Sequence, residues 1–446
     1  GKTAKSETPA RDQFSASLGK LAEAQIVRRK TNDGFVPERG AIAVGRPLSL
    51  PEKGVVFGLT AKRLDVDAWR HLLGNGSSGT DASSESAAEP SSAWAPDGLS
   101  AQVDEVQLGG LVLEKLDLSA TRAQDQWNIR VNARQAAGNL VWHEAGKGKL
   151  VARLSRLSIE RGMEQHATPA DGPTRRLPAL DIVADDFSVR NMRFGRLNVQ
   201  ASNDGNGWNL NRIAASNPYG SLTGKGSWTQ INGASHTQLS FKVDSSNVGE
   251  LLARFGYPGT VKDGTAELDG TLAWNGAPTE LDYASMNGEM NLKAAKGQFL
   301  KHDPGAAGKL LGLISLQNLP RRIALDFKDV FSDGLVFGAI DGKVDVQHGV
   351  MHTDRLQIDS PVARVLMRGD VDLGKETQRL DVAVQPEVGD TAALGVAMLN
   401  PAVGAATWIA SKVLSNPLGS VFGFHYLITG TWDDLKVEKV SAPPES

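Results

Sequence analysis

Two histidines have the spacing of a metal site. His348 and His352 stand four residues apart, as zinc ligands do on a helix. Gly349 falls between them, and the flanking residues alternate between apolar and polar, which places the pair across a turn or on a strand. We therefore expect solvated histidines and no bound metal.

Two pairs of acidic residues are the other candidates for chemistry. Asp185-Asp186 and Asp433-Asp434 are adjacent in sequence. Adjacent residues on a strand point to opposite faces, so neither pair is expected to act as acid and base. The chain lacks the Gly-x-Ser-x-Gly motif of hydrolases, and Gly220 to Gly226 does not have the spacing of a phosphate-binding loop. The sequence predicts a protein that is not an enzyme and uses no cofactor.

Composition narrows the classes of fold and partner. With 48 basic and 51 acidic residues the formal net charge is -3, so the chain has no overall basic field to attract nucleic acid. It contains no cysteine, which excludes disulfides, thiolate catalysis and cysteine-bound zinc. Glycine reaches 48 residues and aromatic residues only 6%, which favours many short strands joined by tight turns. All-β is the expected class.

Alternation of apolar and polar residues is the main structural signal. From Trp127 to Val131 every second residue is apolar and the residues between are polar. Runs of this kind recur, and from Ile340 to Val388 turn-forming residues separate them as in an antiparallel meander. The apolar positions expected to share one face, and to line a lipid groove if the sheet forms one, are Trp127, Ile129, Val131, Leu239, Phe241, Val243, Leu268, Leu292, Ile323, Leu325, Phe327, Val344, Val346, Leu356, Ile358, Val365, Met367, Leu380, Val382 and Val384.

Several predicted strands end in a glycine closely followed by tryptophan. The pattern occurs from Leu222 to Trp228, from Leu268 to Trp274 and from Ile428 to Trp432. Its spacing is irregular, which indicates related hairpins and not a strict solenoid. Hairpin packing explains these tryptophans as well as contact with lipid does.

Helices are too few to cover so much sheet. Val248 to Phe255 predicts a short helix, Ala306 to Leu319 an amphipathic helix, and residues 391–424 a long, weakly polar helical stretch. The apolar face must then be covered by a second sheet, by the same sheet closed into a barrel, or by apolar ligand held in a curled trough. Alternation alone does not choose among the three.

The last of these stretches is long enough to meet a membrane. Residues 391–411 and 413–432 carry no charged side chain, and Lys412 stands alone between them. Because Asn400-Pro401 and Asn416-Pro417 interrupt the stretch, short interfacial or groove-capping helices fit better than a transmembrane span or ordinary core helices. The residues expected to face a membrane are Leu394, Met398, Leu399, Trp408, Ile409, Val413 and Leu414.

Short motifs at predicted strand ends recur in a definite order across most of residues 41–440. They are Asp65 to Trp69, Phe194 to Leu197, Gly207 to Leu210, Gly226 to Trp228, Asp341 to Val344, Gly349 to Thr353, Arg368 to Leu373 and Tyr426 to Trp432. Each is weak alone, but their order resembles the C-terminal region of the YhdP branch of the AsmA-like family, which also includes TamB.

The resemblance implies a fold and a function. The fold is an elongated, curled antiparallel β-sheet that forms an apolar groove, the repeating β-groove, with a few amphipathic helices mainly near the C-terminus. The function is non-enzymatic transfer of phospholipid, whose acyl chains lie in the groove, through the periplasm between the inner and outer membranes. The parent protein would be anchored to the inner membrane through an upstream segment absent from this chain.

The partners expected from the resemblance are phospholipids, the two membrane surfaces and other envelope proteins. The alternative function is a structural or assembly factor for outer-membrane biogenesis that acts by β-strand edge pairing.

Two irregular stretches divide the chain. Residues 74–98 are rich in Ser, Ala and Gly, and residues 162–178 contain three prolines. The expected segments are a β segment of the groove at 1–73 with a truncated start, a disordered insertion at 74–98, a β-meander at 99–161, a linker at 162–178, an AsmA-like β-groove with short helices at 179–388, an apolar, membrane-facing helical segment at 389–425, and a final strand and tail at 426–446.

Overall fold

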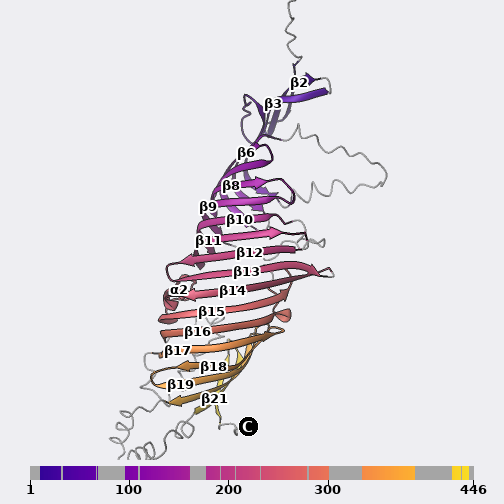
Figure 1. Cartoon of the computed structure of the whole chain (residues 1–446). Coiled ribbons are helices and arrows are strands. Elements are labelled where there is room, and N and C mark those ends of the chain that lie inside the picture. The colour runs from indigo at the N-terminus through magenta and orange to yellow at the C-terminus, as the bar shows by residue number, and fades with distance from the viewer. Residues whose placement is uncertain are drawn as a thin grey trace, which may run out of the picture. The chain divides into compact units, whose positions relative to one another are not determined.

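The fold is mainly β, as the sequence predicts. The computed structural model describes residues 11–31, 34–66, 68, 96–108, 111–160, 177–190, 192–205, 207–231, 233–278, 281–300, 334–386, 424–432 and 434–440. The described part holds the strands β1 to β22, the α-helix α2 and the 3-10 helix η4 (Figure 1). It divides into two compact units, an N-terminal unit of residues 1–208 and a C-terminal unit of residues 209–446.

The N-terminal unit is a curled sheet whose strands mostly lie in chain order (Figure 1). Its strands are β1 (Arg11–Leu18), β2 (Ala22–Thr31), β3 (Gly34–Val44), β4 (Gly54–Asp65), β5 (Gly98–Leu108), β6 (Leu111–Ala123), β7 (Gln126–Asn132), β8 (Ala136–His143), β9 (Lys149–Ile159), β10 (Ala179–Val189) and β11 (Met192–Asn203).

The C-terminal unit is likewise curled β-sheet, in which β13 to β22 pair with their chain neighbours in antiparallel fashion. Its elements are β12 (Gly207–Asn217, beginning two residues before the division), β13 (Gly220–Ile231), β14 (Ala234–Ser245), α2 (Val248–Arg254), β15 (Val261–Asn275), η4 (Tyr283–Ser285), β16 (Asn287–Phe299), β17 (Leu335–Gln347), β18 (Val350–Asp359), β19 (Ala363–Asp372), β20 (Thr377–Pro386), β21 (Phe424–Thr431) and β22 (Leu435–Val440).

Helix α2 lies where the sequence predicts a helix. The side chain of Asn247 accepts a hydrogen bond from the backbone N–H of Glu250, which satisfies one of the free donors of the first turn. Val248 and Leu252 pack against the main apolar cluster of the C-terminal unit, and Leu251 is buried. The amphipathic pattern of only two turns is therefore stabilised mainly by packing against the sheet.

Parallel pairs depart from the expected meander. In the described part of the N-terminal unit, β3 with β4, β4 with β5, and β9 with β10 run parallel. Parallel neighbours need a connection that carries the chain back across the sheet. The two stretches that the sequence marks as irregular, 74–98 and 162–178, fall between strands of such pairs.

The connection from β3 to β4 crosses the polar face of the sheet. Arg46 lies over Gly58, where an added Cβ would meet the Arg46 Cδ at 3.1 Å, and its Nη1 donates to the Ser100 Oγ at 3.0 Å. A cavity of about 380 Å³ remains between this connection and the small residues beneath it, which include Ala43 and Gly98. The opposite, apolar face is left clear of this crossover.

Bulges keep the apolar side chains on one face. In β5, Leu99, Ala101 and Val103 are followed on the same face by Val106, because Asp104 and Glu105 both turn toward solvent. Two successive charged residues inside an alternating strand, here Asp104 and Glu105, mark this point.

The pair Asp185-Asp186 marks another bulge, and the expectation that its members point to opposite faces is wrong. The register of β10 shifts between Ala184 and Phe187, and both aspartates are exposed. They lie together on the solvent face of the strand.

The C-terminal unit contains a tightly packed core. Ile358, Val365, Val382, Val384 and Ile428 are each at most 2% exposed and belong to one apolar cluster. These inward side chains of β18 to β21 therefore carry much of the stability of this unit.

Truncating a leucine should be costly where this face is packed and milder where it is half-exposed. We expect Leu380→Ala, whose side chain is 3% exposed, to lower the free energy of unfolding by about 2–5 kcal/mol. Leu222→Ala, at a half-buried position of the same unit, should cost less than half as much, because fewer contacts are lost. Urea denaturation measures both, and equal losses would contradict the difference in packing.

Candidate functional site

The register of the N-terminal unit places apolar residues in a continuous row. Each member pairs with the next across neighbouring strands, and paired residues point to the same face. From β1 to β11 the row reads Ala16, Ala24, Ile42, Phe57, Leu99, Ala120, Ile129, Leu140, Ala152, Ile182 and Val199. No polar side chain interrupts it.

A second row runs beside the first, two residues along each strand. It reads Leu18, Ala22, Val44, Leu59, Ala101, Leu118, Val131, Gly138, Leu154, Ala184 and Leu197. At ~4.8 Å between strands, each row extends for roughly 48 Å. We call the two the apolar rows; together they form a band that carries no charge.

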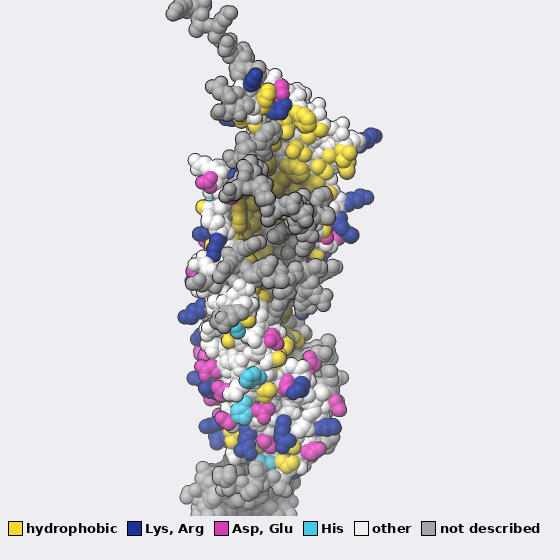
Figure 2. Space-filling model, turned by 90° about the vertical axis from the view of Figure 1, so that its right-hand side faces the viewer, with side chains coloured by type: hydrophobic (Ala, Val, Ile, Leu, Met, Phe, Trp, Pro, Cys, Tyr) yellow, Lys and Arg dark blue, Asp and Glu magenta, His cyan; other side chains and the backbone are white. Residues whose placement is uncertain are grey.

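The apolar rows are not fully covered. Phe57, Leu99, Leu118, Ile129 and Leu140 are all half-buried, although they lie in the middle of the sheet. Figure 2 shows hydrophobic side chains gathered on a hollowed wall of the N-terminal unit. Half-exposed apolar surface on this scale marks a binding surface.

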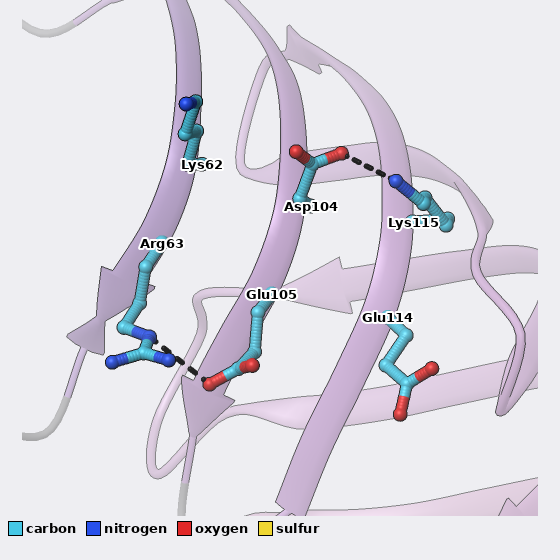
Figure 3. Close-up of a pocket in the computed structure, with 6 residues that line it drawn as sticks. All are labelled: Lys62, Arg63, Asp104, Glu105, Glu114 and Lys115. Carbon is cyan, nitrogen blue, oxygen red and sulfur yellow. Dashed lines mark hydrogen bonds and ion pairs between the residues drawn. The ribbon is translucent and has the colours of Figure 1, made fainter.

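The opposite face of the same strands is polar. Between the apolar rows the outward positions include Ser119, Arg130 and Asn139. At the bulge of β4 to β6, Lys62, Arg63, Asp104, Glu105, Glu114 and Lys115 line an open pocket (Figure 3). The Lys115 Nζ lies 2.8 Å from the Asp104 Oδ1, and this hydrogen bond lowers the pKa of Asp104 and raises that of Lys115. Such exposed ion pairs indicate that this face is in contact with solvent.

The C-terminal unit continues the same design within its own sheet. One row runs Leu222, Val243, Leu268, Leu292, Gly342, Leu356, Met367, Val382 and Tyr426. Toward β13 to β16 its members are half-buried, but Val382 and Tyr426 are 1% and 3% exposed. The half-exposed part could receive a ligand, whereas the buried part is already filled.

The described apolar residues singled out in the sequence fall on the apolar face of their unit. The register places Trp127, Ile129 and Val131 there in the N-terminal unit. In the C-terminal unit it places Leu239, Phe241, Val243, Leu268, Leu292, Val344, Val346, Leu356, Ile358, Val365, Met367, Leu380, Val382 and Val384.

Other sequence predictions lie outside the described residues. They are the lining positions Ile323, Leu325 and Phe327, the helix from Ala306 to Leu319, and the membrane-facing residues Leu394, Met398, Leu399, Trp408, Ile409, Val413 and Leu414.

The tryptophans form a feature that the sequence alone did not reveal. In the N-terminal unit Trp127 and Trp142 are direct cross-strand partners at the ends of β7 and β8, and the Trp208 indole N–H donates to the carbonyl of Pro178 just before β10. In the C-terminal unit Trp228 and Trp274 both pair with residues near the start of β14, and Trp432 follows the end of β21.

Strand direction places these residues together. Successive antiparallel strands begin and end at alternate edges, so tryptophans at a strand start and at the next strand end share one edge. In each unit the described tryptophans lie along one edge of the apolar face, which we call the tryptophan edge. Noting whether each tryptophan lies at the start or the end of its predicted strand would have identified this edge from the sequence.

The histidine pair does not form a joint site. His348 sits in the turn between β17 and β18, whereas His352 lies on β18. The His352 Nδ1 is 2.7 Å from the Asp370 Oδ1, and its Nε2 is 3.1 Å from the Asp354 Oδ1. These hydrogen bonds raise the pKa of His352. Among the described residues no His, Asp or Glu cluster has the arrangement of a metal site.

The helices that the structure describes are too short or too polar to cross a membrane.

Comparison with known proteins gives two matches. The family model described as YhdP protein matches residues 2–437. The "Intermembrane phospholipid transporter YhdP" of Escherichia coli (strain K12) is 31% identical over 253 residues, which make up 56% of this chain and 20% of that relative. No solved structure gives a significant match.

The stability of the C-terminal unit should depend weakly on pH through His352. Its pKa is raised in the folded state above the ordinary 6.5, so its ion pairs stabilise the fold below that pH and are lost as pH rises through the folded-state pKa. We expect the Tm of the wild type to exceed that of His352→Gln by a larger margin at pH 6 than at pH 8.5. This margin should not exceed about 2 °C, because the ring is half-exposed. Thermal unfolding at both pH values checks this, and a larger gap at pH 8.5 would reverse the sign.

Proposed function

The chain belongs to the YhdP family, and from this premise we propose that it is a segment of a non-enzymatic phospholipid conduit. The acyl chains lie on the apolar rows, and the headgroup stays in water at the margin of the sheet. The E. coli relative is described as an intermembrane phospholipid transporter, which supports this class of cargo. We place the segment in the periplasm, between the inner and outer membranes.

One observation carries the proposal: the apolar rows are continuous, and their large side chains from Phe57 to Leu140 are only half-buried, whereas members such as Leu154 and Leu197 are buried. Exposing one methylene to water costs ~0.8 kcal/mol of free energy, so a lipid with roughly thirty methylenes would face a cost of ~24 kcal/mol if it crossed water without a protein. A wall that includes Phe57, Leu99, Leu118, Ile129 and Leu140 offsets part of that cost on the side of the lipid that it covers. Because hydrophobic contact has no direction, the chains can slide from one position to the next.

The chain is one part of such a system. It spans about a fifth of the length of the E. coli relative. We therefore propose that the complete protein transports phospholipid between membranes and that this segment holds the acyl chains in its groove. The membrane surfaces are its expected partners.

Edge pairing with other envelope proteins is the alternative function. It needs an exposed edge strand that can form backbone hydrogen bonds with a partner strand. The last described strand, β22, has only six residues and carries Lys436, Glu438 and Lys439. Charges and short length are the usual means of preventing edge pairing. This composition disfavours the alternative at that edge.

A charge placed on the apolar rows should expel lipid. We expect Ile129→Asp to reduce the phospholipid that copurifies with the chain by about tenfold or more, because an apolar contact worth ~1.5–3 kcal/mol is replaced by a carboxylate. Lipid extraction and quantification by mass spectrometry measure the loss.

Asn128→Asp is the matched control. It adds the same charge one residue away on the same strand, but on the polar face, so lipid content should stay at the wild-type level. Both variants must first give the wild-type circular dichroism spectrum. Equal lipid content in the wild type and in a folded Ile129→Asp would contradict the proposed groove.

A further inference from the structure

The two edges of the apolar face differ chemically in the N-terminal unit. The tryptophan edge carries Trp127, Trp142 and Arg122, which pairs with Trp127 in the register. At the opposite edge the inward residues include Leu108, Ile159 and Val189, all apolar. A lipid lying on the apolar rows therefore meets a guanidinium and two indole rings at β6 to β8 on one side, and apolar side chains on the other.

Arg122 is held in place at the tryptophan edge. Its Nη2 lies 2.7 Å from the Glu144 Oε2, and the Trp127 indole N–H donates to the Glu144 Oε1 at 2.9 Å. These contacts orient the guanidinium but do not use all of its donors. The Arg122 Nε is buried and has no acceptor in the part of the chain that the structure describes.

The same pattern recurs at the tryptophan edge of the C-terminal unit. The indole nitrogens of Trp228 and Trp432 are buried and lack an acceptor among the described residues. By contrast, the Trp274 indole N–H donates to the carbonyl of Ala277 at 3.1 Å. Buried donors without acceptors are rare and unfavourable in folded proteins. Such donors occur at the tryptophan edge of each unit, which points to an acceptor supplied by a ligand.

We infer that the tryptophan edge is where the headgroup of the bound lipid lies, with its phosphodiester oxygens accepting from these free N–H groups. The acyl chains then extend over the apolar rows toward the opposite edge. Arginine forms charge-assisted hydrogen bonds with phosphodiester oxygens, and the amphipathic tryptophan ring favours the boundary between hydrocarbon and water. The inference rests on the proposed function and adds a direction to it: within each unit, bound lipids share one orientation on the sheet.

Arg134 provides an internal contrast at the other edge. It follows β7, and its two terminal nitrogens pair with Glu114 at 2.9 Å and Glu160 at 3.3 Å. Its guanidinium is thus neutralised by two carboxylates. A headgroup phosphate gains little there, so the two arginines are expected to differ in function.

The orientation is testable because the chain has no cysteine. Gln126→Cys and Asn132→Cys each introduce a single thiol, one at either end of β7. Each full-length variant is labelled with a fluorophore and loaded with phosphatidylcholine that carries a nitroxide either on the headgroup or at the chain end. We expect the headgroup nitroxide to quench position 126 at least twofold more than position 132, and the chain-end nitroxide to show the reverse order.

A second measurement tests the donor itself. Arg122→Met and Arg134→Met are compared for capture of phosphatidylglycerol and of diacylglycerol with the same chains. We expect Arg122→Met to retain several-fold less phosphatidylglycerol while keeping its diacylglycerol, and Arg134→Met to retain both.

The outcomes separate this inference from the proposed function. Capture of lipid with equal quenching at the two ends of β7, or equal losses in the two arginine variants, would overturn the headgroup edge and leave the groove standing. Failure of the wild type to capture either lipid would overturn both. Should Arg122→Met not fold, the quenching order at the two ends of β7 decides alone.

Discussion

The structure depends on a single constraint: a sheet this extensive has an apolar face that the described helices, α2 and η4, are too short to cover. In the N-terminal unit that face is kept continuous by cross-strand pairing, so that Ile129 meets Leu140 and Ala120 on its two sides. A slip of one residue in any strand would turn polar side chains into the band. Register is therefore the property on which lipid binding would depend, more than any single side chain.

Much of this was predictable from the residues. Period-two alternation identified the strands and the face of positions such as Phe241 and Val382, because hydrophobic burial is the dominant local signal. The bulges and the parallel pairs were not predicted. Strict alternation assumes a regular antiparallel ladder, whereas the Asp185-Asp186 bulge resets the phase and β4 pairs with distant β5 in parallel. Long-range pairing leaves no periodic trace in sequence.

The candidate site was predictable only as a face, and not as a surface with two different edges. Single tryptophans at strand ends are equally consistent with hairpin packing. Only the pairing of Trp127 with Trp142, and the burial of Arg122 Nε beside them, distinguishes one edge. The same limit applies to depth: Leu222 and Val382 share a row, yet one is half-buried and the other fully buried. Alternation reports the side of a sheet and gives no measure of what lies over it.

The parallel pairs have a consequence for how the N-terminal unit is assembled. A meander can zip up hairpin by hairpin, since each strand finds its neighbour across a short turn. β9 and β10 cannot do so, because the chain between them must close a loop of about twenty residues before the first ladder bond forms, at an entropic cost that grows with loop length. Such closures raise contact order and slow folding. The unit is thus expected to form first as separate blocks of antiparallel hairpins, such as β5 to β9. The pairing of these blocks through the parallel strands then limits the rate of folding.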